Sequence, residues 1–310
     1  MSDPKPLRIG TRGSPLALAQ AYEVRKRLCK VDPLMTKSTM PIIKTIKTTG
    51  DKILDRPLKE IGGKGLFSKE IDESLLQNNI DIAVHSMKDL ETLIPNGIIL
   101  AATMEREDPR DVFISQLALS LDKLPPGSII GTSSLRRQAQ ILNLRPDIIV
   151  KPFRGNVQTR MQKMNDGEVD ATLLALAGLK RLKIADMTME ILQPDIILPA
   201  VGQGAIGVTC RTEDMVSLTK LRTINHKPSW QRIIAERAML ATLDGSCQTP
   251  IGGLASLDLD GKLSLKGILA NEDGSKIFTT IKEGLAVDAK AIGTNVGKEL
   301  RRLADVDFLK

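Results

Sequence analysis

The sequence predicts an α/β protein that ends in a small α+β module. Short apolar runs alternate with amphipathic segments from residue 7 to about residue 174, which is the pattern of strands followed by helices. Corners rich in glycine, serine and threonine follow several of these runs, where α/β folds place ligand sites. After about Thr223 one helical segment precedes three strand-like runs. A chain of 310 residues is long enough for two or three domains.

The first α/β region opens with an apolar run that predicts a strand at Leu7–Thr11. Ser14 followed by Pro15 is typical of a helix start, because serine caps the helix and proline suits its first turn. This helix is expected to continue to about Lys30. Further strands are predicted at Pro41–Thr48, Ile80–Val84 and Ile98–Thr103, with a helix capped by Ser68 after the first of them.

The same alternation restarts near Glu105–Asp111, in the middle of the chain. It predicts strands at Ser128–Gly131, Asp147–Val150 and Asp170–Leu174, and helices at Ser134–Leu144 and Asn156–Asn165. This order favours parallel sheets covered by helices. Leu198–Val208 then predicts a glycine-rich turn that leads into a strand.

The C-terminal part has a different pattern, typical of an α+β module. A helix is predicted at Ser229–Leu243 and a closing helix from about Asp288. The predicted strands between them are Gly253–Leu259, Lys262–Leu269 and Ser275–Ile281.

Composition excludes several classes of protein. No run of about 18 apolar residues is present, so no membrane span is expected. The N-terminal residues MSDPKPLRIG hold no apolar signal core, so we expect a cytoplasmic protein. Three cysteines argue against a disulfide framework, and two histidines without CxxC or HExxH predict that there is no metal site. The phosphate-binding motif GxxxxGK[ST] is also missing.

The net charge is positive, with 44 Lys and Arg against 37 Asp and Glu, which gives +7. The chain has only five Phe, one Tyr and one Trp. Proteins that bind single-stranded nucleic acid use aromatic side chains as stacking platforms. We therefore expect the positive charge to serve an anionic small molecule.

The charge is concentrated in Gly131–Arg181, where nine Lys and Arg against four acids give an excess of +5. In this segment a predicted strand leads through Thr132 and Ser134 into a helix whose first turn holds Arg136 and Arg137. Cations in the first turn of a helix are unfavourable because they oppose the helix dipole, and a neighbouring anion would offset this cost. Helix amides, hydroxyls and guanidinium groups together form a carboxylate or phosphate site. The alternative is a capped helix with solvated arginines.

Three other corners repeat this arrangement of a strand, a turn and a cation. They contain Arg154 with Gly155, Arg12 with Ser14, and Lys64 in a glycine-rich turn. Each corner alone is weak evidence, because glycine-rich turns are common. Four of them in one α/β chain favour an anion-lined site, and arginine suits bidentate binding of carboxylates.

Asp89 and Cys247 are the candidates for reactive groups. Asp89 follows Lys88 after an apolar strand, and a carboxylate among cations stays ionised and can stabilise a cationic intermediate. It could equally be an ordinary turn residue. Cys247 lies in a loop of small residues, where a basic environment would favour the thiolate, although a lone loop cysteine is usually inert. Cys29 and Cys210 are expected to be packing residues.

Taken together, the motifs resemble the porphobilinogen deaminase (hydroxymethylbilane synthase) family. The matching segments come in the family's order: Gly10–Gln20, Ile61–Phe67, Asp81–Asp89, Glu105–Asp111, Gly131–Arg137, Arg154–Arg160, Leu174–Leu182, Leu198–Gly207, Ala235–Ala238 and Gly245–Gly252. The last 55 or so residues match only in general character.

The resemblance implies two domains of the periplasmic-binding-protein type II fold and a small α+β domain. Residues 1–104 with 200–222 would form the first, 105–199 the second, and 223–310 the third, which carries the cofactor cysteine. The family joins four porphobilinogens head to tail, releases ammonia at each step and hydrolyses off hydroxymethylbilane for tetrapyrrole and haem biosynthesis. The resemblance implies a transferase that acts on this small molecule as a cytoplasmic monomer, with no nucleic-acid or membrane partner.

The resemblance also assigns site residues. Asp89 matches the catalytic carboxylate, which would stabilise an azafulvenium cation, and Cys247 matches the thioether link to the dipyrromethane cofactor. The other positions expected to hold the cofactor are Lys88, Thr132, Ser134, Arg136, Arg137, Arg154 and Gly155. The positions expected to bind substrate are Arg12, Ser14, Lys64, Phe67, Arg154, Arg160 and Arg181.

Two positions depart from the family pattern. The family commonly has proline two residues after the catalytic carboxylate, where this chain has Glu91. Some members have lysine where Glu60 occurs, so no anion contact is assigned there.

Two other classes of function remain as alternatives. A non-catalytic anion-binding protein or ligand-sensing regulator of the same fold would need neither Cys247 nor Asp89. A nucleic-acid-binding protein would lose affinity steeply with salt and form no covalent adduct.

Overall fold

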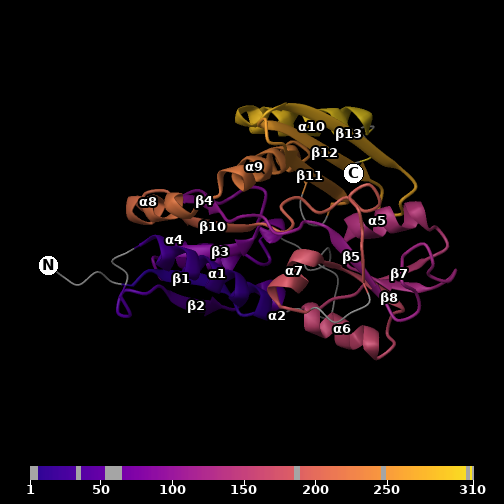
Figure 1. Cartoon of the computed structure of the whole chain (residues 1–310), viewed down its shortest axis with the longest axis horizontal. Coiled ribbons are helices and arrows are strands. Elements are labelled where there is room, and N and C mark those ends of the chain that lie inside the picture. Colours follow the sequence, from indigo (N-terminus) through magenta and orange to yellow (C-terminus); the bar gives the residue numbers. More distant parts are fainter. Residues whose placement is uncertain are drawn as a thin grey trace. The chain divides into compact units, whose positions relative to one another are not determined.

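The computed structural model describes residues 6–32, 36–52, 65–184, 189–245, 249–304 and 308 (Figure 1). By their internal contacts these residues form two compact units. Within the described ranges, unit 1 holds residues up to 52, 65–106 and 205–230, and unit 2 holds 107–204 and those from 231 onward. The division into three domains stays a prediction.

The described part of unit 1 is built on a five-stranded mixed sheet in the order β2-β1-β3-β10-β4. The strands are β1 (Arg8–Arg12), β2 (Ile42–Ile46), β3 (Ile82–Ser86), β4 (Ile98–Thr103) and β10 (Ile206–Arg211). β1 runs parallel to β2 and β3, with Ile9 opposite Ile82, whereas β10 is antiparallel to β3 and β4. Strands β1 and β3 therefore end at the same edge of the sheet.

Helices cover both faces of this sheet. These are α1 (Pro15–Val31), α4 (Lys69–Leu76) and α8 (Met215–Ile224), and the unit also contains the short helix α2 (Thr49–Lys52). Val24 and Leu28 of α1 and Leu221 of α8 pack with the sheet in one core, and Ile71 and Leu75 of α4 belong to a second core. The N-terminus of α1 is capped as predicted, because Ser14 Oγ accepts a hydrogen bond from Ala17 N at 3.3 Å.

The α/β part of unit 2 repeats this topology in its described strands, in the order β7-β6-β8-β5-β9. Its elements are β5 (Asp111–Ser115), β6 (Ile129–Gly131), α5 (Leu135–Leu144), β7 (Ile149–Lys151), α6 (Val157–Asn165), β8 (Ala171–Ala175), α7 (Leu176–Arg181) and β9 (Met189–Ile191). β6 is parallel to β7 and β8, and β5 is antiparallel to β8 and β9. Ile141 of α5 belongs to one core and Met161 of α6 to the other.

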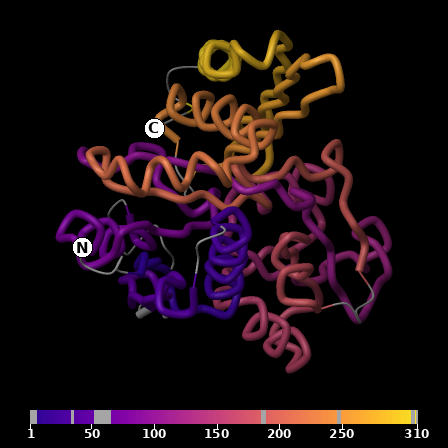
Figure 2. The backbone as a smooth tube through the Cα atoms, turned by 60° about the vertical axis from the view of Figure 1, so that its left-hand side comes forward, coloured from indigo at the N-terminus to yellow at the C-terminus, as the bar shows by residue number. Residues whose placement is uncertain are grey.

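The C-terminal part of unit 2 packs two helices against an antiparallel sheet that has three described strands. The elements are α9 (Lys227–Thr242), β11 (Ile251–Leu257), β12 (Lys262–Ala270), β13 (Ile277–Leu285) and α10 (Ala289–Leu303). Helices α9 and α10 lie side by side in both backbone views (Figures 1 and 2). A Cβ on Gly293 would lie 2.0 Å from the Ala235 carbonyl oxygen, so only glycine allows this approach.

The predicted α/β fold class is confirmed: the described strands form two mixed sheets with helices packed on them and a C-terminal antiparallel sheet with its own helices. Two sequence-based expectations need correction. The α/β sheets are mixed rather than parallel, because β5 and β10 run against their neighbours. Five elements of the structure were also not predicted: α2, α7, α8, β5 and β9.

None of the helices in the described part of the chain combines the length and apolarity that crossing a membrane requires.

Candidate active site

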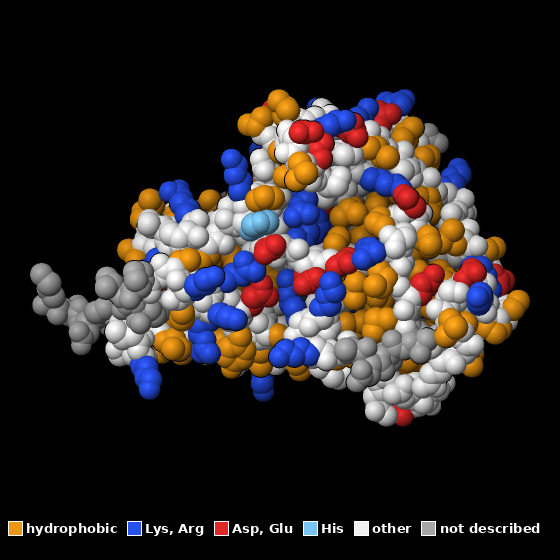
Figure 3. Space-filling model, in the orientation of Figure 1, with side chains coloured by type: hydrophobic (Ala, Val, Ile, Leu, Met, Phe, Trp, Pro, Cys, Tyr) orange, Lys and Arg blue, Asp and Glu red, His pale blue; other side chains and the backbone are white. Residues whose placement is uncertain are grey.

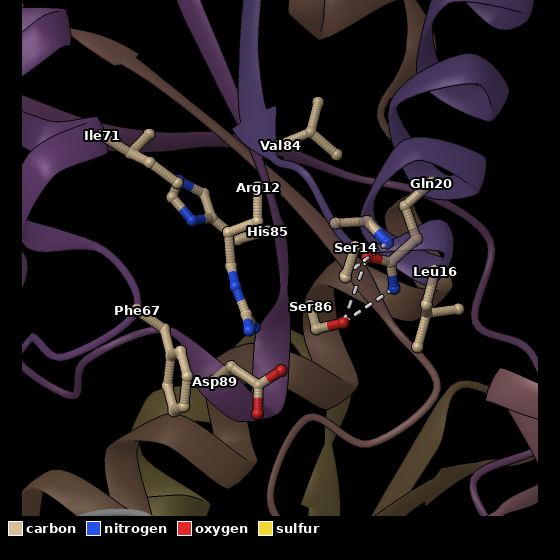
Figure 4. A pocket seen from close by; sticks show the side chains of 11 residues that line it. Arg12, Ser14, Leu16, Gln20, Phe67, Ile71, Val84, His85, Ser86 and Asp89 are labelled. Carbon is tan, nitrogen blue, oxygen red and sulfur yellow. Dashed lines mark hydrogen bonds between the residues drawn. The ribbon is translucent and has the colours of Figure 1, made fainter. Parts of the chain in front are cut away.

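Unit 1 has a pocket at the edge where its parallel strands end. β1 ends at Arg12, and β3 ends at Ser86 and continues into a short 3₁₀ turn, Met87–Asp89. The pocket is lined by Arg12, Ser14, Leu16, Ala17, Gln20, Phe67, Ile71, Val84, His85, Ser86 and Asp89. Four predicted site residues from three separate regions of the sequence therefore share one pocket: Arg12, Ser14, Phe67 and Asp89 (Figure 4).

The Arg12 guanidinium is held by a carboxylate and an aromatic ring. Its Nη2 lies 2.5 Å from Asp51 Oδ1, and its Cζ lies 4.3 Å from the centre of the Phe67 ring. Burial alone would raise the pKa of Asp51, but the hydrogen bonds and charge of Arg12, with help from Thr48, lower it instead. The guanidinium extends toward the space between Phe67 and Asp89 (Figure 4). Arg12 is therefore oriented before any ligand binds.

The rest of the pocket wall is fixed by side-chain hydrogen bonds. Gln20 Nε2 donates to Ser86 Oγ at 2.7 Å, and Ser86 Oγ is 3.1 Å from Gln20 Oε1 (Figure 4). His85 is buried, and its Nε2 lies 3.1 Å from Thr209 Oγ1. These contacts tie α1, β3 and β10 together beneath the pocket.

Asp89 is partly exposed at the pocket rim and belongs to the same turn as Lys88. Its carboxylate shares the pocket with the Arg12 guanidinium and the Phe67 ring. A carboxylate fixed on a short turn can stabilise a positive charge that develops beside it and can accept N–H hydrogen bonds. The site can thus bind an anionic group at Arg12 and stabilise a positive charge beside Asp89. Lys and Arg side chains are also spread over the surface near α1 and β1, with Asp and Glu among them (Figure 3).

A second set of predicted residues lies in unit 2, at the edge where β6 and β7 end. Thr132 is buried and its Oγ1 accepts a hydrogen bond from Ser134 N at 3.1 Å. Among the described residues, Ser134 is the N-cap of α5 but its side chain makes no capping hydrogen bond. The Ser134 hydroxyl is therefore not used to cap the helix.

The residues that follow β7 form the next corner. Gly155 has a left-handed φ of +128°, and an added Cβ would lie 2.7 Å from Thr159. Arg160 Nε donates to the Gly155 carbonyl at 3.2 Å, and Arg154 precedes this glycine. Arg181 Nη2 donates to the Gly204 carbonyl at 3.0 Å. The parallel pairing of β6 with β7 brings the Thr132 and Arg154 corners to one edge of the sheet.

Arg136 and Arg137 are buried around Asp111. Their Nη2 atoms lie 2.8 and 2.7 Å from the two carboxylate oxygens, and each side chain is about 5% exposed or less. Arg136 also donates to the Leu198 carbonyl at 2.6 Å and Arg137 to the Leu173 carbonyl at 2.7 Å. Burial would raise the pKa of Asp111, but the two guanidinium charges outweigh it and hold this pKa well below its usual range. The anion beside these two first-turn arginines is therefore Asp111 of the same chain.

One donor of this corner is left without a hydrogen-bond partner among the described residues. Within the described part of the chain, the buried Arg136 Nε has no hydrogen-bond partner. One guanidinium donor is therefore left over after Asp111 and the backbone have been satisfied. Binding of a cofactor by Arg136 and Arg137 stays a prediction.

Two predicted site residues, Lys64 and Cys247, lie outside the described residues. The sequence analysis did not single out Asp51, Asp111 or Gln203. Gln203 Nε2 donates to Asp111 Oδ1 at 2.8 Å and so belongs to the buried ion-pair network. One signal was available for Asp111, because a charged residue there begins the otherwise apolar run of β5.

Asp72 is a buried acid in the first turn of α4. Its pKa is raised to about 6, because burial and the Glu91 charge together outweigh the opposing hydrogen bond from Ser68. Its Oδ1 atom has no hydrogen-bond partner among the described residues. The Asp72 carboxyl therefore holds its proton more tightly in the folded state than in the unfolded chain. Its ionisation lowers the free energy of unfolding as the pH rises from about 4, and the full cost is reached above pH 6. Asp72→Asn should raise the free energy of unfolding by about 1–2 kcal/mol at pH 7.5 and have little effect at pH 4. Urea unfolding at both pH values measures this, and an equal effect at both would contradict it.

Comparison with known proteins gives one family over nearly the whole chain. Residues 7–219 match "Porphobilinogen deaminase, dipyromethane cofactor binding domain", and residues 230–302 match "Porphobilinogen deaminase, C-terminal domain". The porphobilinogen deaminase of Paracoccus denitrificans is 50% identical over 309 residues, covering 99% of this chain and 98% of that protein. The chloroplastic enzyme of Pisum sativum is 52% identical over 305 residues, covering 97% of this chain and 83% of that protein.

Among solved structures, the probable amino-acid transporter binding protein ytmK of Bacillus subtilis is similar with a TM-score of 0.43. It is 12% identical and covers 72% of this chain and 90% of that chain. The sequence matches decide the assignment: the chain belongs to the porphobilinogen deaminase family.

Proposed function

We propose that the protein is a hydroxymethylbilane synthase. It is a transferase that joins four porphobilinogens head to tail on a dipyrromethane primer, releases ammonia at each step, and then releases hydroxymethylbilane by hydrolysis. The observation that carries the proposal is the single pocket that holds Asp89, Arg12 and Phe67, in a chain of this family. The proposal includes the three-domain division, a cytoplasmic location and a monomeric state.

The cationic side chains suit this substrate. Each porphobilinogen carries an acetate and a propionate, so binding requires donors that can grip carboxylates. In unit 1 these are Arg12 and the Ser14 hydroxyl. Lys64, which lies outside the described residues, is proposed as a further donor. In unit 2 they are Arg154, Arg160 and Arg181. Arg12 is already oriented by Asp51, so little ordering is needed when the substrate carboxylate arrives.

Asp89 is proposed to act on the charge that the reaction creates. Porphobilinogen loses its protonated amino group as ammonia, and the remaining methylene-pyrrole is an azafulvenium cation. The Asp89 carboxylate stabilises this cation and accepts hydrogen bonds from pyrrole N–H groups. A neutral side chain in its place would leave the positive charge without a counter-ion.

The dipyrromethane cofactor is assigned to the remaining predicted residues. Cys247 is proposed to carry it through a thioether, and Lys88, Thr132, Ser134, Arg136, Arg137, Arg154 and Gly155 to bind or accommodate it. When bound, the cofactor supplies the pyrrole carbon to which the first substrate is joined. Two observations on the described residues support this assignment: Arg136 Nε has no hydrogen-bond partner, and the corner after Arg154 turns through a glycine with a left-handed φ.

The test is turnover of porphobilinogen by the purified protein. We expect four ammonia molecules to be released for each hydroxymethylbilane formed. A non-catalytic anion-binding protein of the same fold would bind porphobilinogen and release no ammonia, which would contradict the proposal.

A further inference from the structure

Glu91 makes a contact that the family's usual proline could not make. Its Oε1 accepts a hydrogen bond from the backbone N–H of Gly65 at 2.6 Å. A carboxylate that accepts from an amide is a strong, charge-assisted acceptor, whereas proline has no side-chain acceptor. The bond joins the segment just after Asp89 to residues 26 positions earlier in the chain.

Gly65 begins a tight turn that leads into α4. Its φ is +80°, a left-handed conformation that favours glycine, and its carbonyl accepts from Ser68 N at 3.0 Å and Lys69 N at 2.9 Å. The next carbonyl, that of Leu66, accepts from Gly50 N at 2.7 Å. The turn is thereby tied at one end to the loop after Asp89 and at its middle to α2.

Phe67 is the residue that this turn places in the pocket. Its ring lies over the Arg12 guanidinium at 4.3 Å and packs so closely on α2 that a Cβ on Gly50 would lie 2.3 Å from it. Arg12 in turn is bound to Asp51 of α2. The position of the turn therefore determines the position of the ring that covers Arg12.

We propose that Glu91 is a positioning residue, which acts through Gly65 to hold Phe67 over Arg12 and so orders the substrate-carboxylate site. The inference rests on the proposed function, because it assigns Arg12 and Phe67 to porphobilinogen binding. Glu91 takes no part in the chemistry at Asp89. Its loss should weaken substrate binding in the ground state and the transition state alike, which raises KM and leaves kcat almost unchanged.

The test uses the full-length protein with three variants. Glu91→Ala removes the acceptor, Glu91→Gln keeps an acceptor oxygen without the charge, and Leu93→Ala is the control, because Leu93 is 73% exposed in the same loop. The first measurement is hydrogen exchange of the Gly65 amide, which does not depend on activity. We expect exchange about tenfold faster in Glu91→Ala, and rates within about twofold of the wild type in the other two variants.

The second measurement is steady-state kinetics with porphobilinogen. KM should rise about three- to tenfold in Glu91→Ala with kcat within about twofold, and Glu91→Gln should restore most of the wild-type KM. Unchanged Gly65 exchange in Glu91→Ala overturns the contact. Faster exchange with an unchanged KM overturns the positioning role. A wild-type protein that turns over no porphobilinogen overturns the proposed function itself, and the exchange result then reports on the contact alone.

Discussion

Asp111→Ala should lower the free energy of unfolding by about 3–5 kcal/mol, because it leaves two buried guanidinium groups without a counter-ion. Arg136 and Arg137 are both buried against this carboxylate, at 2.8 and 2.7 Å. The backbone carbonyls that they also contact cannot neutralise their charge. Urea unfolding at pH 7 measures the change, and a loss of solubility on expression would agree with it.

A neighbouring ion pair offers the matched control. Asp108 binds Arg110 at 2.7 Å, but the Arg110 side chain is 30% exposed, so Asp108→Ala should cost about 1 kcal/mol or less. Because the pKa of Asp111 is lowered in the folded state, its contribution is complete above pH 4 and is lost as the pH falls further. The difference in the free energy of unfolding between the wild type and Asp111→Ala should therefore become smaller below pH 4. Equal effects of the two variants at pH 7 would contradict this account of the buried network.

Asp89→Ala should lower kcat about a hundred- to a thousandfold, as expected when a group that stabilises developing charge is removed. Stability should change little, because Asp89 is partly exposed in a surface turn. Asp89→Asn keeps the shape without the charge and should be nearly as inactive, whereas Asp89→Glu keeps the charge in a displaced position and should retain more activity. Ammonia release at saturating porphobilinogen measures kcat. A kcat for Asp89→Asn within tenfold of the wild type would show that the charge is not what the reaction needs.

Local signals were sufficient to predict much of the fold. The strand at residues 98–103 has the predicted bounds, and the Ser14-Pro15 start of α1 is confirmed. Periodicity failed where an element is short or partly exposed. Helix α8 was missed although Asp214 caps it and Leu218 and Leu221 are buried, since exposed Met215 and Val216 blur its apolar face.

Antiparallel pairing could not be predicted from the alternation of elements. The strands β5 and β10 run antiparallel to their neighbours. Both lie where the chain passes from one sheet to the other: β5 follows β4 of the first sheet, and β10 joins the first sheet after the strands of the second. Such a reversal depends on tertiary topology, and no local residue pattern encodes it.

For the site, residues at strand ends were predictable and their partners were not. Arg12 and Asp89 follow apolar strands, so their placement at one sheet edge follows from parallel pairing. Asp51 lies 39 residues from Arg12, and Asp111 lies 25 and 26 residues from Arg136 and Arg137. Ion pairs over such separations are set by packing, which is why two arginines expected at a ligand site are found paired with an internal acid.

The most direct test is the intact mass of the wild-type protein and of Cys247→Ser, each after incubation with porphobilinogen and compared with the mass calculated from its sequence. We expect a wild-type excess of two porphobilinogens less two ammonias, and no excess in Cys247→Ser. An unmodified wild-type mass after that incubation, or the same excess in both proteins, would contradict the assignment of Cys247 as the site of the dipyrromethane primer.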